Sequence, residues 1–105
     1  MLFKIIKATF EVKSESFGYD FLMEIERKRS GASKYGDQSA HTLNLYEAKS
    51  GKWLEDKLFD TRYDRVPLTK KEWVKTWKNY IFNNWCDVSS IELVEYHEDI
   101  IEVED

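Results

Sequence analysis

The sequence has one cysteine, one proline, two histidines and no long apolar run. Because Cys86 is alone, the chain cannot form an intramolecular disulfide. A spanning helix needs about 20 consecutive apolar residues, and no such stretch exists. Lys4, Lys7 and Glu11 interrupt the apolar stretch at the N-terminus, which is not typical of a signal peptide. These absences predict a cytoplasmic protein with no membrane segment.

Basic residues are absent from the C-terminal end of the chain. Residues 1–86 hold all 16 Lys and Arg against 12 Asp and Glu, a balance of 16 − 12 = +4. Residues 87–105 hold 8 acidic residues and no Lys or Arg, so the whole chain has a net charge of 4 − 8 = −4 with His neutral. This asymmetry predicts two surfaces of opposite charge, or an acidic tail on a mildly basic body.

The composition is that of a folded chain. Hydrophobic residues make up 42% and charged residues 34% of the 105 residues. This balance supports one hydrophobic core with a well-solvated surface, and the length leaves no room for a second core. We therefore expect residues 1–105 to form a single domain.

Alternating apolar and polar residues predict two strands near the N-terminus. In residues 3–12 and 19–28, every second residue is apolar, so one face of each strand would be buried. Turn-forming residues at 13–18 predict that the two strands form an antiparallel hairpin. The residues expected to point inward are Ile6, Ala8, Phe10, Val12, Tyr19, Phe21, Met23 and Ile25.

The next segments predict a loop and a second hairpin. Residues 29–39 contain two Gly and three Ser, which indicates a flexible loop. Residues 40–47 predict a strand, and a turn at 48–51 would use a positive φ at Gly51. Residues 52–60 would form the partner strand. Their apolar residues fall on both faces, which predicts either a bulge or a strand buried on both sides.

Pro67 ends the extended part of the chain, and a helix is expected from 70 to 85. Thr69 and Glu72 have the spacing of a capping box, in which each side chain pairs with a backbone N–H of the first turn. Residues 91–97 predict a last strand. Residues 98–105 extend that strand at the sheet edge, form another strand or remain a flexible acidic tail. The predicted fold is α+β, with the order β-β-β-β-α-β, about five mostly antiparallel strands and one helix packed on a sheet face.

The predicted helix contains three of the four tryptophans. At about 100° per residue, Trp73, Trp77, Tyr80 and Ile81 form one stripe, which predicts that they cover the sheet. The alternative is that the stripe is a stacking platform for a ligand. Phe82 projects to the opposite side, where it either contacts a partner or packs under the 29–39 loop.

The sequence offers weak support for catalysis. Cys86 lies at the predicted helix C-terminus, where the dipole disfavours a thiolate, and we expect it to be a buried small hydrophobe. His41 and His97 lie outside any catalytic motif. Glu24 and Glu26 share a strand face, about 7 Å apart by strand rise, but they alternate with Lys28 as on a solvated face. We therefore expect no enzyme activity.

Metal or cofactor binding has no better support. His97, Glu98 and Asp99 are three consecutive potential ligands. Consecutive strand residues point to opposite faces, however, so the three cannot converge on one ion. We expect no cofactor and no dedicated metal site.

The acidic C-terminal segment is the first candidate binding surface. Carboxylates there surround a few apolar residues, a combination suited to a basic protein partner, as in small inhibitors and immunity proteins. An extended segment of this kind could also pair with another sheet edge, in a homodimer or in a partner. The predicted partner-binding residues are Tyr96, Glu98, Asp99, Ile100, Ile101, Glu102 and Phe82.

The alternative function is nucleic-acid binding by the basic 27–35 segment. Basic side chains beside exposed aromatic rings can contact phosphates and stack on bases. The overall pI of about 5.2 argues against this alternative, because nucleic-acid-binding domains are usually basic. A small enzyme is the third possibility. The residues expected to bind nucleic acid are Arg27, Lys28, Arg29, Lys34 and Tyr35.

Overall fold

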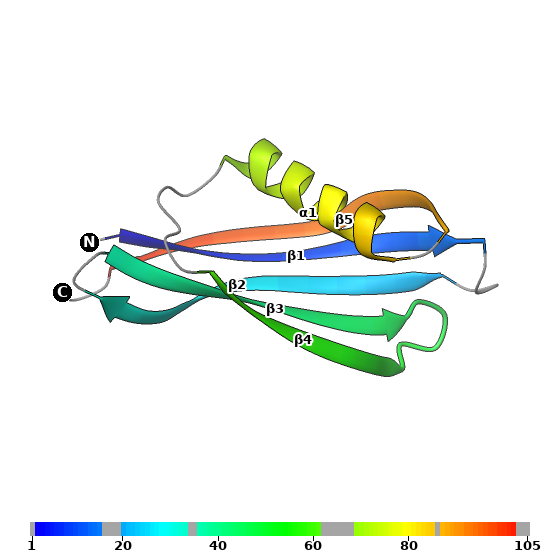
Figure 1. Ribbon diagram of the computed structural model, residues 1–105, viewed down its shortest axis with the longest axis horizontal. Coiled ribbons are helices and arrows are strands. Elements are labelled where there is room, and N and C mark those ends of the chain that lie inside the picture. The colour runs from blue at the N-terminus through cyan, green and yellow to red at the C-terminus, as the bar shows by residue number, and fades with distance from the viewer. Residues whose placement is uncertain (1, 16–19, 34–35, 62–68, 86, 103–105) are drawn as a thin grey trace.

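Five antiparallel strands form one sheet, and a single helix crosses one of its faces in the computed structural model (Figure 1). The structure describes residues 2–15, 20–33, 36–61, 69–85 and 87–102. The predicted α+β fold and the order β-β-β-β-α-β are confirmed. The elements are β1 (Leu2–Ser14), β2 (Phe21–Ser33), β3 (Gly36–Glu47), β4 (Trp53–Thr61), α1 (Lys70–Asn84) and β5 (Val88–Glu102).

The last strand lies beside the first. The strand order is β4-β3-β2-β1-β5, so β1 has β2 on one side and β5 on the other. The pairing of β1 with β5 runs from Leu2 opposite Glu102 to Ser14 opposite Val88. Of the three outcomes expected for residues 98–105, extension of the last strand is therefore correct up to Glu102.

The two faces of the sheet differ in what covers them. Helix α1 packs on the face that we call the covered face, and we call the other the far face. The predicted inward alternation in β1 and β2 is confirmed for all described positions, and Tyr19 lies outside them. The buried hydrophobic residues on the covered face are Ile6, Ala8, Phe10, Val12, Phe21, Met23, Ile25, Leu43 and Leu45.

Helix α1 begins at a capped end and seals the core with its tryptophans. The Thr69 hydroxyl accepts a hydrogen bond from the backbone N–H of Glu72 at 3.3 Å, which satisfies one of the unpaired donors of the first turn. Trp73, Trp77 and Ile81 are buried, so the prediction that the aromatic stripe is core is confirmed.

The prediction of a loop at residues 29–39 is wrong. Strand β2 continues to Ser33 and β3 begins at Gly36, with these two residues paired. The register shifts between Arg29 and Gly31, which leaves one extra residue in β2. The bulge takes up the extra residue, so the Gly- and Ser-rich segment stays paired with β3 on both sides of it.

Of the two explanations for the apolar residues on both faces of segment 52–60, the structure shows the bulge. The register of β3 with β4 shifts between Leu45 and Tyr46, opposite Glu55 and Trp53. Gly51 in the preceding turn has a φ of 72°, as expected for a glycine that reverses the chain. Among the described residues, no helix is both long enough and apolar enough to cross a membrane.

Candidate functional site

Strand β5 is an edge strand of unusual length. It has 15 residues, and within the described parts of the chain no strand pairs with its outer side. An edge strand carries a row of backbone N–H and C=O groups that another strand can pair with, and most proteins shorten or cover such edges. Strand β5 therefore has the backbone groups needed to receive a further strand.

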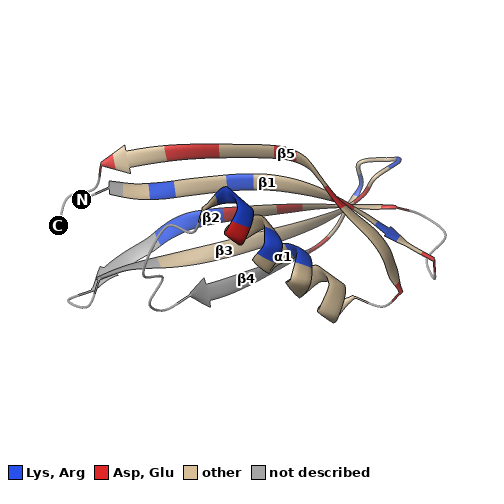
Figure 2. Ribbon diagram, turned by 90° about the horizontal axis from the view of Figure 1, so that it is seen from above, with Lys and Arg blue, Asp and Glu red and all other residues tan. Residues whose placement is uncertain are grey.

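Acidic residues recur along β5 (Figure 2), and exposed apolar residues lie between them. Val94 and Ile100 are 51% and 58% exposed. Val94 is the extra residue of a bulge, because Thr9 pairs with Glu95 and Phe10 with Leu93. The strand contains no Lys or Arg. Its acidic residues are Glu92, Glu95, Glu98, Asp99 and Glu102.

Tyr96 and Glu98 form a small network with Lys4 on the covered face. The Tyr96 hydroxyl donates to Glu98 Oε1 at 2.8 Å, and Lys4 Nζ lies 3.1 Å from the same oxygen. These contacts lower the pKa of the Glu98 carboxyl, the hydrogen bond from Tyr96 having the larger effect. Burial, followed by the bond to Glu98, raises the pKa of the Tyr96 hydroxyl. At neutral pH Tyr96 is therefore a neutral donor and Glu98 an anionic acceptor.

The predicted partner-binding residues of β5 are not equally available. Tyr96 is half-buried with its ring edge against Trp73, at a centroid distance of 6.0 Å. Glu98 is held by the network described above. Asp99, Ile100 and Glu102 are exposed. Ile101 is half-buried and alternates to the other side of the strand from Ile100.

Phe82 does not belong to the β5 surface. It lies on α1 and is 63% exposed. Lys70, the helix residue whose Nζ lies 4.9 Å from the Tyr96 ring centroid, is 12 residues earlier. At 1.5 Å per residue this places Phe82 about 18 Å further along the helix axis. The predicted set therefore divides into the β5 residues and a separate exposed aromatic residue.

The basic residues predicted to bind nucleic acid do not form a surface loop. Arg27 lies in β2 on the covered face, is only 6% exposed and has its guanidinium 4.3 Å from the Phe3 ring centroid. It also donates a hydrogen bond to the Lys4 carbonyl. Arg29 is half-buried in the same strand. The reason is alternation, since Arg27 follows Met23 and Ile25 at a spacing of two and so points to the same side.

Other predicted residues have different outcomes. Lys28 is exposed on the far face, and its Nζ lies 3.3 Å from Glu26 Oε1. Lys34 and Tyr35 lie outside the described residues, as does Cys86.

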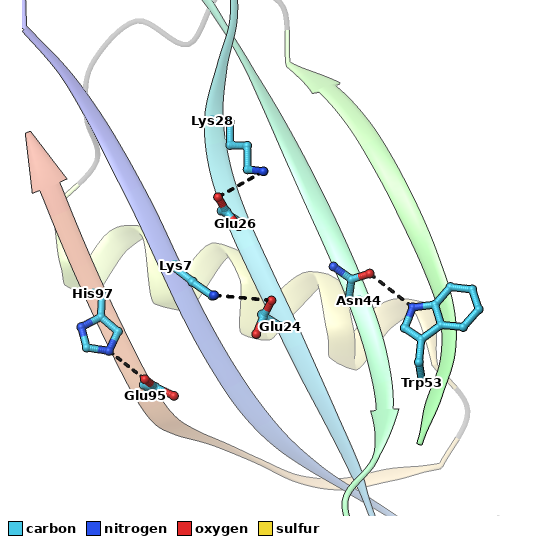
Figure 3. A network of polar contacts seen from close by, with 8 residues as sticks. All are labelled: Lys7, Glu24, Glu26, Lys28, Asn44, Trp53, Glu95 and His97. Carbon is cyan, nitrogen blue, oxygen red and sulfur yellow. Dashed lines mark hydrogen bonds and ion pairs between the residues drawn. The ribbon is translucent and has the colours of Figure 1, made fainter. Parts of the chain in front are cut away.

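Polar side chains of the far face form a network of contacts (Figure 3). Lys7 Nζ lies 3.9 Å from Glu24 Oε1, so each of the paired carboxylates Glu24 and Glu26 faces a lysine. His97 is exposed and lies 2.7 Å from Glu95. In the part of the chain that the structure describes, no three His, Cys, Asp or Glu side chains gather as a metal site.

Sequence reasoning missed the environment of the other histidine. His41 is buried between two tryptophans, and its Nε2 accepts from Trp73 Nε1 at 3.3 Å. The ring centroid of Trp77 lies 5.0 Å away. The signal was present, because His41 alternates with Leu43 and Leu45 and so belongs to the inward side of its strand.

The edge position of β5, its acidic side chains and its two exposed apolar residues are the features from which a function can be inferred. Neither a family model, a curated protein nor a solved structure matches the chain.

Proposed function

We propose that this chain is a non-enzymatic binding protein, and that edge strand β5 engages a protein partner by receiving an extended, basic segment. The observation that carries the proposal is the combination of a 15-residue edge strand with five acidic residues and no basic one. Backbone pairing would supply affinity, and the carboxylates would select a partner of opposite charge. We also propose that the protein acts in the cytoplasm, because a chain with one cysteine gains no internal disulfide from an oxidising compartment.

Protection against aggregation explains only part of this surface. Acidic side chains on an edge strand discourage pairing with other proteins, as does a bulge. Val94 and Ile100 act in the opposite direction, because exposed apolar side chains on an edge favour association. Their exposure supports an edge that receives one kind of strand and repels others.

A second copy of the chain is a poor occupant of this edge. Pairing β5 with β5 of another molecule would bring ten carboxylates, five from each strand, onto one two-stranded ribbon. Like charges directly opposite each other across strands are destabilising. A basic segment of a different protein relieves this repulsion, and we therefore favour a heterologous partner over an edge-strand homodimer.

The test compares two charge-reversed baits in a pull-down from cells that express the chain. Asp99→Lys with Glu102→Lys reverses two exposed carboxylates of β5. Glu15→Lys with Glu55→Lys reverses two exposed carboxylates outside β5, changes net charge equally and is the matched control. We expect the partner recovered with the natural chain to be lost with the β5 bait and retained with the control bait. Hydrogen exchange on the recovered complex should show slower exchange of backbone amides in residues 88–102.

Retention of the partner by a folded β5 bait would contradict the proposal. So would a recovered complex in which the amides of β5 exchange as fast as in the isolated chain. Circular dichroism of both baits establishes that each is folded before the comparison is made.

A further inference from the structure

A second surface lies on the solvent side of α1, where six residues line an open groove of ≈ 520 Å³. They form two rows along the helix, each with the i, i+4 spacing that places side chains above one another. Val74 provides an apolar floor, and the remaining lining is mostly cationic. The lining residues are Lys70, Lys71, Val74, Lys75, Lys78 and Asn79.

The lysines of this groove differ in their surroundings. Lys70 lies over the Tyr96 ring, and its charge helps to lower the pKa of the Glu98 carboxyl. Lys71, Lys75 and Lys78 form no ion pair with a described residue, whereas Lys4, Lys7 and Lys28 each do. The only acidic residue of α1 is Glu72, which does not line the groove. The groove therefore presents positive charge although the chain as a whole is acidic.

An exposed aromatic ring continues the same side of the helix. Phe82 follows Lys78 by four residues and Lys75 by seven, so it lies one to two turns further along that side. From Lys71 to Phe82 the helix rises by about 16 Å. Phe82 is 63% exposed, and its ring lies outside the core that α1 seals.

We propose that this side of α1 binds single-stranded nucleic acid, with Lys71, Lys75 and Lys78 contacting phosphates and Phe82 stacking on a base. Proteins that bind single strands without strong sequence preference combine a basic groove with aromatic stacking residues. A membrane surface fits less well, because a helix that lies in a membrane interface buries a broad apolar face, and here the solvent side offers little beyond Phe82. This surface replaces the basic 27–35 segment, in which Arg27 is buried, and it is independent of the proposed role of β5.

The net negative charge of the chain does not prevent nucleic acid from binding at α1, because the charges are separated on the surface. The acidic residues of β5 lie at the sheet edge, and the lysines lie along α1 (Figure 2). At about 0.1 M salt the Debye length is about 10 Å, so repulsion from more distant carboxylates is screened. Three phosphate contacts predict a slope of about −2 for the logarithm of the association constant against the logarithm of salt concentration.

The experiment measures fluorescence anisotropy of a labelled oligothymidine of about 15 nucleotides, at about 50 mM and about 200 mM salt. For the natural chain we expect a roughly 20-fold loss of affinity between these two conditions. Lys71→Glu with Lys75→Glu should weaken binding at least about 10-fold and flatten the salt dependence. The control is Lys49→Glu with Lys52→Glu, which changes net charge equally at an exposed turn and should have little effect.

Phe82→Ala distinguishes a nucleic-acid site from a general polyanion site. Loss of one stacked base should weaken binding about five-fold or more while leaving the salt dependence unchanged. The proposal is overturned if the natural chain fails to bind at about 50 mM salt, or if the control variant loses as much affinity as the α1 variant. It is also overturned if Phe82→Ala has no effect, or if the chain binds phosphatidylserine vesicles but not the oligonucleotide. None of these outcomes bears on the β5 pull-down, which uses a different surface.

Discussion

The two faces of the sheet use alternate residues of the same strands and are stabilised in different ways. On the covered face, Phe10, Met23 and Ile25 are fully removed from solvent beneath α1. On the far face, their strand neighbours Glu24 and Glu26 face lysines across or along the strands. Burial of a large apolar side chain contributes about 1.5–3 kcal/mol, whereas an exposed ion pair contributes about 0–1 kcal/mol. The covered face therefore determines stability, and the far face mainly keeps the sheet solvated.

This difference also explains where the candidate binding surfaces lie. The covered face is occupied by α1, and the far face satisfies many of its charges internally. The edge of β5 and the solvent side of α1 have exposed groups without such partners, among them Ile100 and Lys75. Function is therefore expected at the β5 edge and on the solvent side of α1 rather than on either face of the sheet itself.

The largest expected effect on stability comes from comparing a substitution on the buried side of α1 with one on its solvent side. Trp77 is 8% exposed and packs against His41 and Tyr80, whereas Phe82 is 63% exposed. Trp77→Ala should lower the free energy of unfolding by about 3–5 kcal/mol, a large fraction of the roughly 5–15 kcal/mol that is typical of a small domain. Phe82→Ser should change it by less than about 0.5 kcal/mol. Urea denaturation followed by circular dichroism measures both, and equal losses would contradict the assignment of the aromatic stripe to the core.

A smaller loss of stability is expected when a tryptophan hydrogen bond is removed, and its size should differ between the two faces of the sheet. Trp73 Nε1 donates to buried His41, and Nε1 of exposed Trp53 lies 3.4 Å from Asn44 Oδ1 on the far face. Trp73→Phe keeps most of the ring but leaves the His41 acceptor without this donor. We expect a loss of about 1–3 kcal/mol, because water cannot readily replace a buried partner. Trp53→Phe, the matched control, should cost less than about 0.5 kcal/mol.

Thermal melting of both variants at neutral pH makes this comparison. The assignment depends on His41 Nε2 being the acceptor, which places the ring proton on Nδ1. If Trp53→Phe proved as destabilising as Trp73→Phe, the burial of the hydrogen bond would not be what determines its contribution.

Local patterns predicted the elements well, because each depends on residues close together in the chain. Alternation identified the inward residues of β1 and β2, and helical spacing placed Trp73 and Trp77 in the core. The Thr69 cap and the positive φ of Gly51 are equally local. These features follow from backbone geometry and side-chain volume, so a single sequence is enough to find them.

Features that depend on distant pairing were not predictable in this way. The long 88–102 strand exists because β1 pairs with it over its whole length, and no local pattern identifies that partner. Lys4 and Glu98 are 94 positions apart and meet only because of this register. The charge of Arg27 suggests an exposed side chain, but its alternation with Ile25 places it on the covered face, where it is buried.

The smallest expected effect lies at the margin of the covered face, where Glu98 contacts Tyr96 and Lys4 beside solvent. Its pKa is lower in the folded chain than in the unfolded chain, mainly because of the hydrogen bond from Tyr96. The resulting stability is therefore present at neutral pH and is lost as pH falls through the folded pKa. Glu98→Gln should be less stable than the natural chain at pH 7 by less than about 1 kcal/mol, and the difference should disappear in acid.

Urea denaturation of both chains between about pH 7 and pH 3 tests this expectation. Glu92→Gln is the control, because Glu92 is exposed on the same strand and forms no ion pair with a described residue. Its stability difference from the natural chain should not vary with pH as that of Glu98→Gln does. Parallel pH profiles for the natural chain and Glu98→Gln would mean that solvent screens the network completely. In that case Glu98, although it lies on the covered face, would contribute as little to the free energy of unfolding as the exposed charges of the far face.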